Sequence, residues 1–295
     1  MSSLSYAAPS SVDEAVKLLA GSSGLAKVLS GGTDLLVQMR AGRLKPALIV
    51  DVKKVPGAIG MQKSASGWVI GASTPGAVVE ANAELKADWP GLVEALDLIG
   101  STQVQGRCSL AGNLCNASPA ADSVPAMYAA GAICVVVGPN GKREVPVEQI
   151  PAGPGRTNLA AGEFILEIKL PARQARSGDA YLRFIPRTEM DIAVVGCGVN
   201  VTLDANGVCT AARVSLGAVA PTVLLVDDCA KALVGNKLDD ATLAKLDAAA
   251  QAACKPINDK RGTVEFRTKI AGVLARRTAA IAFDRAMGKS TAKAH

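Results

Sequence analysis

The sequence predicts an α+β protein in two parts, and three observations support this prediction. First, 49% of the 295 residues are hydrophobic and 20% are charged, so the chain can build a substantial core. Second, helical and extended patterns follow each other through residues 1–175, with glycine-rich loops between them. Third, residues 176–287 place extended segments before helical ones. We therefore expect a domain over each range, joined by a polar linker at residues 172–179.

Capping signals and hydrophobic periodicity predict the elements of the first part. The segment Ser11-Val12-Asp13-Glu14 is a capping box that opens an amphipathic helix. A strand at 25–29 leads into a first glycine loop, and a helix follows that loop as far as Ala41. Further on we expect a buried strand at 47–52 and a hairpin that turns at Ser66-Gly67. The remaining elements are a helix capped by Thr74 with Pro75 at its first position, helices at 90–99 and 121–130, strands at 133–137, 143–145 and 164–170, and a loop at 151–162.

The second part opens with extended patterns at 181–185, 192–203 and 208–220. Asn206-Gly207 separates the last two and is a strong hairpin signal, so we expect antiparallel pairing. Three helical patterns follow, and the small polar residues 288–295 are expected to form a disordered tail. The helical patterns lie at 227–233, 241–254 and 263–287.

Composition argues against several classes of function. The seven cysteines include no C-x-x-C pair and the one histidine is His295, so we expect no metal site or iron–sulfur cluster held by this chain. Reduced, buried cysteines, with no signal peptide or long apolar stretch, predict a cytoplasmic protein without a transmembrane segment. The net charge of +6 is dispersed and aromatic residues make up 3%, which argues against nucleic-acid binding. That charge would also suit an anionic cofactor or an acidic partner.

Two loops collect glycine and small hydroxyl residues, and we interpret them as candidate binding loops. Glycine lets backbone N–H groups approach an anion closely, and a helix begins directly after the first loop. Both loops are therefore predicted to bind one dinucleotide pyrophosphate, with the Asp34 carboxylate capping the helix. The first loop is Val28, Leu29, Ser30, Gly31, Gly32, Thr33, Asp34 and Leu35, and the second runs from Cys108 to Asp122 and includes Ser109, Gly112 and Asn113.

Three explanations compete for these loops. A single Gly-Gly pair is commonly just a turn. A Rossmann fingerprint needs Gly-x-Gly-x-x-Gly, which neither loop contains, and Gly196-Cys197-Gly198 lies in an extended apolar run without the third glycine. The third explanation is a flavin site outside the Rossmann class.

Five stretches favour the third explanation: L-S-G-G-T-D-L-L at 29–36, S-L-A-G-N-L-C-N-A-S-P-A-A-D-S at 109–123, E-F-I-L-E-I-K-L-P at 163–171, Y-L-R-F-I-P-R-T-E-M-D-I-A-V-V at 181–195 and F-R-T-K-I-A-G-V-L-A-R-R at 266–277. Through the order and spacing of these five stretches, the chain resembles the FAD-binding medium subunits of the molybdenum hydroxylases, a group that includes carbon monoxide dehydrogenase and xanthine dehydrogenase. The resemblance covers nearly the whole chain. One departure is Ala111, which stands where the family has glycine and would be strained if that position required a positive φ.

The resemblance implies a flavin domain of the vanillyl-alcohol-oxidase (PCMH) type, with lobes near 1–55 and 56–175, followed by a small domain with a three-stranded antiparallel sheet and helices. It implies non-covalent FAD in this chain, a large partner subunit with the molybdenum cofactor and a small partner subunit with two [2Fe–2S] clusters. The assembly would be a dimer of heterotrimers. Electrons would pass from the clusters to FAD and on to NAD, a quinone, a carrier protein or oxygen. This chain would then hold no catalytic residue for the substrate.

The resemblance also assigns roles to single residues. The first loop would bind one side of the pyrophosphate, and Ser109, Gly112 and Asn113 the other. The remaining assignments place Asp122 at the sugar-alcohol part of FAD, Leu166 against the flavin, and Tyr181 and Arg183 beside the isoalloxazine. The alternatives are a helix N-cap for Asp122, a core position for Leu166 and a surface charge for Arg183.

Two other classes of function stay open from the sequence. One is a stand-alone FAD-dependent oxidase of the same fold, for which the second part looks too small and too rich in alanine. The other is a non-catalytic basic binding module, which would be colourless and would bind nucleic acid in a salt-sensitive way.

Overall fold

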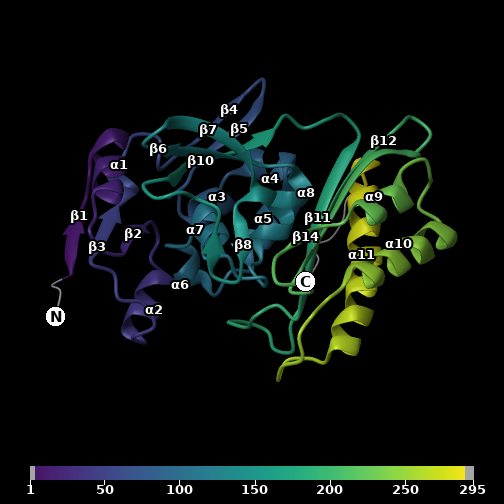
Figure 1. Ribbon diagram of the computed structural model, residues 1–295. Helices are drawn as coiled ribbons and strands as arrows, with labels where there is room; N and C mark the ends of the chain where they lie inside the picture. Colours follow the sequence, from purple (N-terminus) through teal and green to yellow (C-terminus); the bar gives the residue numbers. More distant parts are fainter. Residues whose placement is uncertain (1–3, 290–295) are drawn as a thin grey trace.

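The computed structural model describes residues 4–289 and confirms a mixed fold of helices and strands. Figure 1 shows three parts from left to right: a small N-terminal lobe, a central lobe and a C-terminal domain. Among the helices of residues 4–289, none is both long and apolar enough to cross a membrane.

The N-terminal lobe is a three-stranded parallel sheet with two α-helices. Helix α1 (Val12–Ala20) begins as predicted, because Ser11 Oγ accepts the Glu14 N–H at 3.2 Å. Parallel neighbours end at the same edge of a sheet, so β2 and β3 bring the first glycine loop and the 3-10 helix η1 together there. The elements are β1 (Ser5–Ala7), β2 (Ala26–Leu29), α2 (Leu35–Arg40), β3 (Leu48–Asp51) and η1 (Val52–Lys54), with the strands in the order β1-β3-β2.

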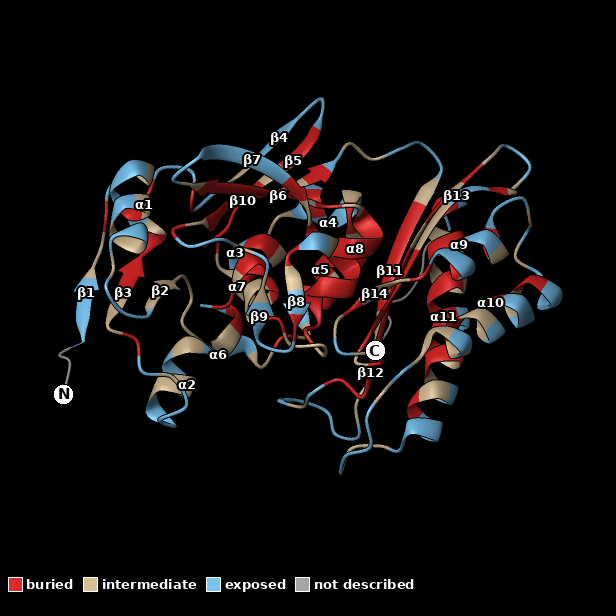
Figure 2. Cartoon of the chain, in the orientation of Figure 1, coloured by how far each residue is buried: buried red, intermediate tan, exposed pale blue. Residues whose placement is uncertain are grey.

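The central lobe is a five-stranded antiparallel sheet with helices packed below it in Figure 1. Its strands lie in the order β4 (Met61–Ser64), β5 (Gly67–Gly71), β10 (Phe164–Pro171), β6 (Ile133–Gly138) and β7 (Gly141–Pro146). Its helices are α3 (Gly76–Glu80), α4 (Ala83–Asp88), α5 (Pro90–Asp97), α6 (Thr102–Gln105), α7 (Leu110–Cys115) and α8 (Ser123–Ala130). Every residue of α8 is buried, as Figure 2 shows, because α8 packs against α5 on one side and against the C-terminal sheet on the other.

The C-terminal domain contains a four-stranded antiparallel sheet, so the predicted count of three strands is wrong. The additional strand has two residues, Leu224 and Leu225, which pair with Leu216 and Ser215. Two residues are too few to produce a recognisable alternation in the sequence. The Asn206-Gly207 hairpin is confirmed by the antiparallel pairing of the strands on either side. The strands are β11 (Ser177–Phe184), β12 (Val195–Leu203), β13 (Cys209–Gly217) and β14 (Leu224–Leu225).

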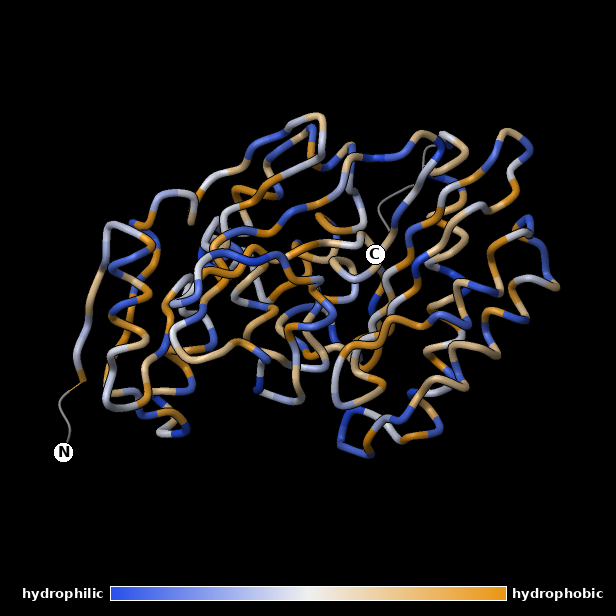
Figure 3. The backbone as a smooth tube through the Cα atoms, turned by 45° about the horizontal axis from the view of Figure 1, so that its top comes forward, coloured by the Kyte–Doolittle hydropathy of each residue, from blue (hydrophilic) through white to orange (hydrophobic). Residues whose placement is uncertain are grey.

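Three helices follow the strands of the C-terminal domain, as predicted: α9 (Asp227–Leu233), α10 (Asp240–Ala253) and α11 (Val264–Ala286). Helix α11 lies along β11 and β12, and α10 packs on α11. Figure 3 shows hydrophobic and hydrophilic residues alternating along these helices, as expected when one face of each helix packs on the domain core.

The predicted linker at 172–179 is wrong at its C-terminal end, because β11 already includes Asp179. Asp179 is 4% exposed, and its Oδ1 accepts from Arg173 Nη2 at 3.1 Å. Arg285 of α11 donates to the Asp179 carbonyl at 2.8 Å and also pairs with Glu94 of α5. The polar residues at this junction therefore form an interface between the central lobe and the C-terminal domain.

Two smaller expectations also changed, and a third is not tested. Thr74 does not cap α3, whose N-cap is Pro75, because the Thr74 hydroxyl bonds to the backbone of Gly60 at 3.0 Å. The predicted loop at 151–162 contains the short strands β8 (Pro151–Gly153) and β9 (Arg156–Thr157), which follow the 3-10 helix η2 (Val147–Gln149). Of the tail that was expected to be disordered, residues 290–295 lie outside the described residues.

Candidate functional site

A cavity of about 520 Å³ lies between the N-terminal lobe and the central lobe, and both glycine loops line it. The loops are in direct contact, because Ser30 Oγ and Ser109 Oγ share a hydrogen bond of 3.0 Å. The structure therefore brings together the two segments that the sequence singled out. The predicted site residues in the cavity wall are Val28, Ser30, Gly31, Gly32, Thr33, Asp34, Leu35, Ser109, Gly112 and Asn113.

The two adjacent glycines of the first loop meet different requirements: Gly31 lacks the space for a side chain, and Gly32 has a backbone conformation that favours glycine. A Cβ on Gly31 would lie 1.8 Å from the carbonyl oxygen of Arg107, so Gly31 permits the two loops to pack against each other. Gly32 has a φ of +78°, a left-handed conformation that costs other residues about 1–2 kcal/mol. One glycine thus sets the distance between the loops, and the other sets the turn into α2.

Four successive backbone N–H groups of the first loop have no acceptor in the described part of the chain. Within residues 4–289, the N–H groups of Gly31, Gly32, Thr33 and Asp34 make no recorded hydrogen bond. The expected cap is wrong, because the Asp34 carboxylate makes no bond to α2. Successive N–H groups left unpaired in a cavity wall form a concave site for an anion.

The second loop is shorter than its sequence suggested, because much of it is the helix α7. Ser109 is the N-cap of α7, and its Oγ accepts the Gly112 N–H at 3.2 Å. Ala111 lies inside this helix and does not have a positive φ, so the strain considered above does not arise. Asn113 Oδ1 accepts from both N and Oγ of Ser123, at 3.2 and 2.7 Å, which leaves its amide NH₂ group as a donor for a ligand.

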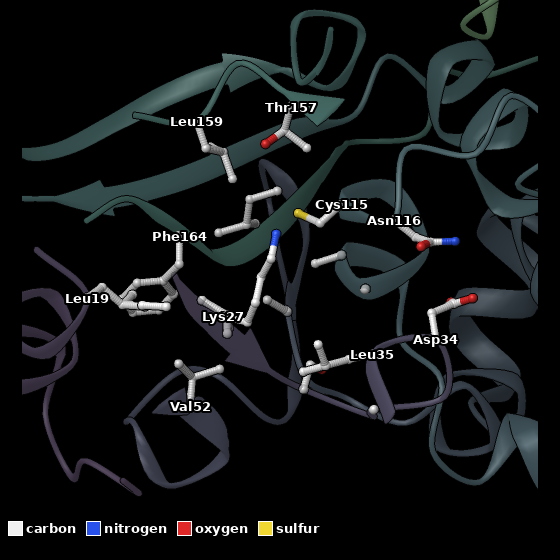
Figure 4. Close-up of a pocket in the computed structure, with 18 of the residues that line it drawn as sticks. Leu19, Lys27, Asp34, Leu35, Val52, Cys115, Asn116, Thr157, Leu159 and Phe164 are labelled. Carbon is white, nitrogen blue, oxygen red and sulfur yellow. The ribbon is translucent and has the colours of Figure 1, made fainter. Parts of the chain in front are cut away.

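Lys27 supplies positive charge inside the cavity, and the sequence analysis missed it. Its side chain extends from β2 into the space below Cys115, as Figure 4 shows. Burial raises the pKa of Cys115 to about 12, and the positive charge of Lys27 opposes that shift. No carboxylate pairs with Lys27 within residues 4–289, so its charge is available to an anionic ligand. Lys27 belongs to the strand that leads into the first glycine loop, and a lysine at that position was the signal that could have revealed it.

The remaining cavity wall is largely apolar and comes from distant parts of the chain. Leu159 and Phe164 face Lys27 from the central lobe in Figure 4, with Thr157 beside Leu159. Gln38 of α2 donates to Asn116 Oδ1 at 3.1 Å and joins the lobes near the glycine loops. These residues carry no local motif, so only the packing of the two lobes places them in the site.

Asp122, Tyr181 and Arg183 meet in a second group that is not part of the cavity wall. The Tyr181 hydroxyl donates to Asp122 Oδ1 at 3.0 Å, and Arg183 Nη1 donates to Oδ2 at 2.8 Å. Burial raises the pKa of Asp122 to about 6, against the opposing effects of Arg183 and Tyr181. The Arg183 side chain is 5% exposed, so it is not a surface charge, and its buried Nε has no partner among residues 4–289. Asp122 makes no side-chain cap bond to α8, so the N-cap alternative also fails.

Two predicted residues lie in neither group. Leu166 is 7% exposed and packs with Val50 and Phe164 in the core between β10 and the N-terminal lobe. It sits at a bulge of β10, next to Ile165, which does line the cavity. Leu29, the last residue of β2 within the first loop, is likewise absent from the cavity wall.

The donors and walls of the cavity fit a dinucleotide. A pyrophosphate carries negative charge that a lysine and a row of backbone N–H groups can bind, and a flat base suits apolar walls. The carboxylate of Glu163, also in the wall, is already paired with Arg143 at 2.8 Å. The charge and the apolar walls of the cavity therefore suit an anionic ligand with an apolar portion.

Comparison with known proteins identifies the family. Residues 2–173 match the model for the FAD binding domain in molybdopterin dehydrogenase, and residues 180–282 match the CO dehydrogenase flavoprotein C-terminal domain. The carbon monoxide dehydrogenase medium chain of Hydrogenophaga pseudoflava is 33% identical over 95% of this chain and 97% of its own. The 6-hydroxypseudooxynicotine dehydrogenase complex subunit alpha of Paenarthrobacter nicotinovorans is 28% identical and covers 96% of each chain.

A solved structure shares the whole fold. It is a carbon monoxide dehydrogenase from Hydrogenophaga pseudoflava that lacks the Mo-pyranopterin moiety of the molybdenum cofactor. It superposes with a TM-score of 0.91 at 33% identity, over 96% of this chain and 98% of that one. The resemblance seen in the sequence motifs is thereby confirmed: the chain belongs to the FAD-binding medium subunits of the molybdenum hydroxylases, a family of oxidoreductases.

Proposed function

We propose that this chain is the electron-transfer subunit of a molybdenum hydroxylase complex, in which bound FAD receives electrons from [2Fe–2S] clusters of a partner subunit. When bound, FAD would supply the redox chemistry that connects those clusters to an external acceptor such as NAD or a quinone. The observation that carries this proposal is the cavity in which Lys27 and the free N–H groups of Gly31 to Asp34 converge.

The cavity residues have distinct roles in this proposal. Lys27 neutralises the pyrophosphate, and the N–H groups of the first loop donate to its oxygens. The contact between Ser30 and Ser109 holds the loops at a fixed separation, so the donors are ordered before the ligand arrives. Leu159 and Phe164 exclude water from the apolar part of the ligand. Residues 1–175 would thus form the nucleotide-binding domain.

The second group is proposed to lie at the flavin end of the cofactor. The buried Nε of Arg183 has no acceptor in the part of the chain that the structure describes, so it could donate to a ligand. Beside the pyrimidine edge of a flavin, this guanidinium would favour negative charge on the ring, and Asp122 and Tyr181 would hold it in place. Residues 176–287 would therefore complete the cofactor site through β11.

The chain is proposed to act in a cytoplasmic dimer of heterotrimers with a large molybdenum subunit and a small iron–sulfur subunit. The cavity of this chain offers no pair of acid and base side chains for a substrate. Of the two carboxylates in the described cavity wall, Glu163 forms an ion pair with Arg143, and Asp34 is the single titratable residue of the first loop. The substrate would be oxidised in the large subunit, and this chain would contribute no catalytic residue to that step.

Purification of the chain with its genomic neighbours tests the proposal. A flavin absorbance band and co-purifying molybdenum and iron are expected. A yellow chain that oxidises a small alcohol without partners would indicate a stand-alone oxidase instead. A colourless chain that binds nucleic acid would reject FAD binding altogether.

A further inference from the structure

Lys53 contacts the backbone of the first glycine loop from outside the cavity. Its ammonium group donates to the Ser30 carbonyl at 3.0 Å and to Asp51 Oδ1 at 2.7 Å. Neither Lys53 nor Asp51 belongs to the cavity wall. Lys53 therefore touches the loop without touching the space that the loop lines.

A buried carboxylate anchors Lys53. Asp51 is 8% exposed, and its two oxygens also accept from the Tyr6 hydroxyl at 2.8 Å and from the Lys53 N–H at 3.1 Å. Burial raises the pKa of Asp51, but the hydrogen bonds from Lys53 and Tyr6 outweigh burial and hold that pKa below its usual value. The carboxylate is therefore ionised at neutral pH. The parallel register sets Asp51 opposite Leu29, so the end of β3 lies beside the start of the loop.

Holding the Ser30 carbonyl also fixes the direction of the next N–H group. The peptide bond is planar and trans, so the Ser30 C=O and the Gly31 N–H point in opposite directions. Glycine has more backbone freedom than any other residue, and an unheld Ser30–Gly31 peptide could rotate. We propose that Lys53 is a positioning residue of the dinucleotide loop, which holds this peptide so that the Gly31 N–H faces the cavity. This inference rests on the proposed function, because the ligand of the loop is FAD.

The two lysines near the loop act by different physical effects. Lys27 stands in the cavity without a carboxylate partner, so it acts through its charge. Lys53 is neutralised by Asp51 and acts through geometry. Removing Lys27 therefore reduces the salt dependence of FAD binding, whereas removing Lys53 together with Asp51 leaves the local charge unchanged and weakens binding equally at low and high salt.

The test measures the Kd for FAD of the full chain after removal and re-addition of flavin. Lys53→Met is expected to weaken binding about tenfold, the loss of one charge-assisted hydrogen bond, and Lys53→Met/Asp51→Asn is expected to weaken it equally with an unchanged salt dependence. Lys53→Arg restores a donor and is expected to recover most of the affinity. Lys54→Met is the matched control, since Lys54 is the exposed neighbour and its side chain makes no hydrogen bond or ion pair within residues 4–289. Asp51→Asn is expected to weaken binding in the wild-type chain but not in the Lys53→Met chain, because the two residues act as a unit.

Two results would overturn the inference: wild-type affinity in a folded Lys53→Met chain, or full additivity of the Asp51 and Lys53 effects. Calorimetry of the flavin-free variants establishes that they are folded. If Lys53→Met does not fold, Tyr6→Phe removes one partner of Asp51 from a residue that is 62% exposed, and an unchanged Kd there would also reject the positioning role. A wild-type chain that binds no FAD would instead reject the proposed function.

Discussion

Ser30 Oγ and Ser109 Oγ lie 3.0 Å apart, although the two residues are separated by 79 positions in the chain. Ser30 belongs to the first glycine loop, and Ser109 caps α7 in the second. The hydrogen bond therefore joins the N-terminal lobe to the central lobe at the cavity. The dinucleotide interpretation required these loops to be neighbours, and a wide separation would have removed its basis.

Ser109→Ala tests this junction. The change removes the cap on the Gly112 N–H and the contact with Ser30, so we expect a loss of about 1 kcal/mol in the free energy of unfolding and weaker FAD binding. Thermal unfolding and FAD titration measure the two effects. Ser10→Ala is the control and should change neither, because Ser10 is exposed and its hydroxyl makes no hydrogen bond within residues 4–289. Unaltered FAD affinity in Ser109→Ala would mean that the junction does not order the site.

Gly32→Val is expected to abolish FAD retention. The position has a φ of +78°, and a Cβ there would meet the side chains of Leu29 and Leu36 at 2.9 and 3.2 Å. Gly42→Ala is the matched control, because Gly42 has a φ of +69° but nothing within 4 Å of the added carbon. It should lose about 1–2 kcal/mol of stability and keep its flavin. The ratio of flavin to protein absorbance is the measurement, and full flavin content in Gly32→Val would contradict the loop assignment.

Lys27→Met should weaken FAD binding about tenfold and flatten its dependence on ionic strength, because the variant loses a positive charge from the wall of the proposed pyrophosphate site. Lys17→Met removes a charge from the exposed side of α1 and serves as the control. FAD titrations at several salt concentrations measure the effect. An unchanged salt slope would show that Lys27 does not contact the pyrophosphate.

Asp122→Ala is expected to destabilise the chain by roughly 3–5 kcal/mol, because it leaves the buried Arg183 without its counter-ion. The double variant Asp122→Ala/Arg183→Met removes both charges and should recover part of that loss. Denaturant unfolding measures stability, and FAD titration of the double variant then reports on cofactor contact alone. A single variant as stable as the wild type would show that the pair is not a buried unit.

The pH dependence of unfolding should reveal Asp51. Its pKa is held below the usual value, so it stabilises the folded chain above the unfolded pKa of about 3.9, and this stabilisation is lost as the pH falls through the lower folded pKa. The Asp51→Asn chain should therefore lose less stability than the wild type between neutral pH and acid. Parallel pH titrations of the unfolding free energy measure the difference, and identical slopes would contradict the assigned pKa shift.

Local signals predicted most helices and strands, because capping, periodicity and turn chemistry act over a few residues. Ser11 capped α1 and Asn206-Gly207 joined two strands, as expected. The failures share a cause. The partner of Thr74 is Gly60 rather than α3. Asp179 is buried, with its carboxylate accepting the Leu92 N–H of α5 and its carbonyl accepting from Arg285 of α11, rather than exposed in a linker. In each case a tertiary contact replaced the local one.

The sequence by itself determined the glycine loops, the family and the cofactor class. The reason is that a loop that requires glycine and small hydroxyl residues contains them as consecutive residues, so the loop is visible in a short stretch of sequence. Only the tertiary structure decided that Gly31 serves the packing against Arg107, that Lys27 enters the cavity and that Asp122 binds Arg183. The physical reason is that a single residue's partner depends on how whole lobes pack together. Such packing joins residues separated by tens of positions, and no short motif in the chain encodes it.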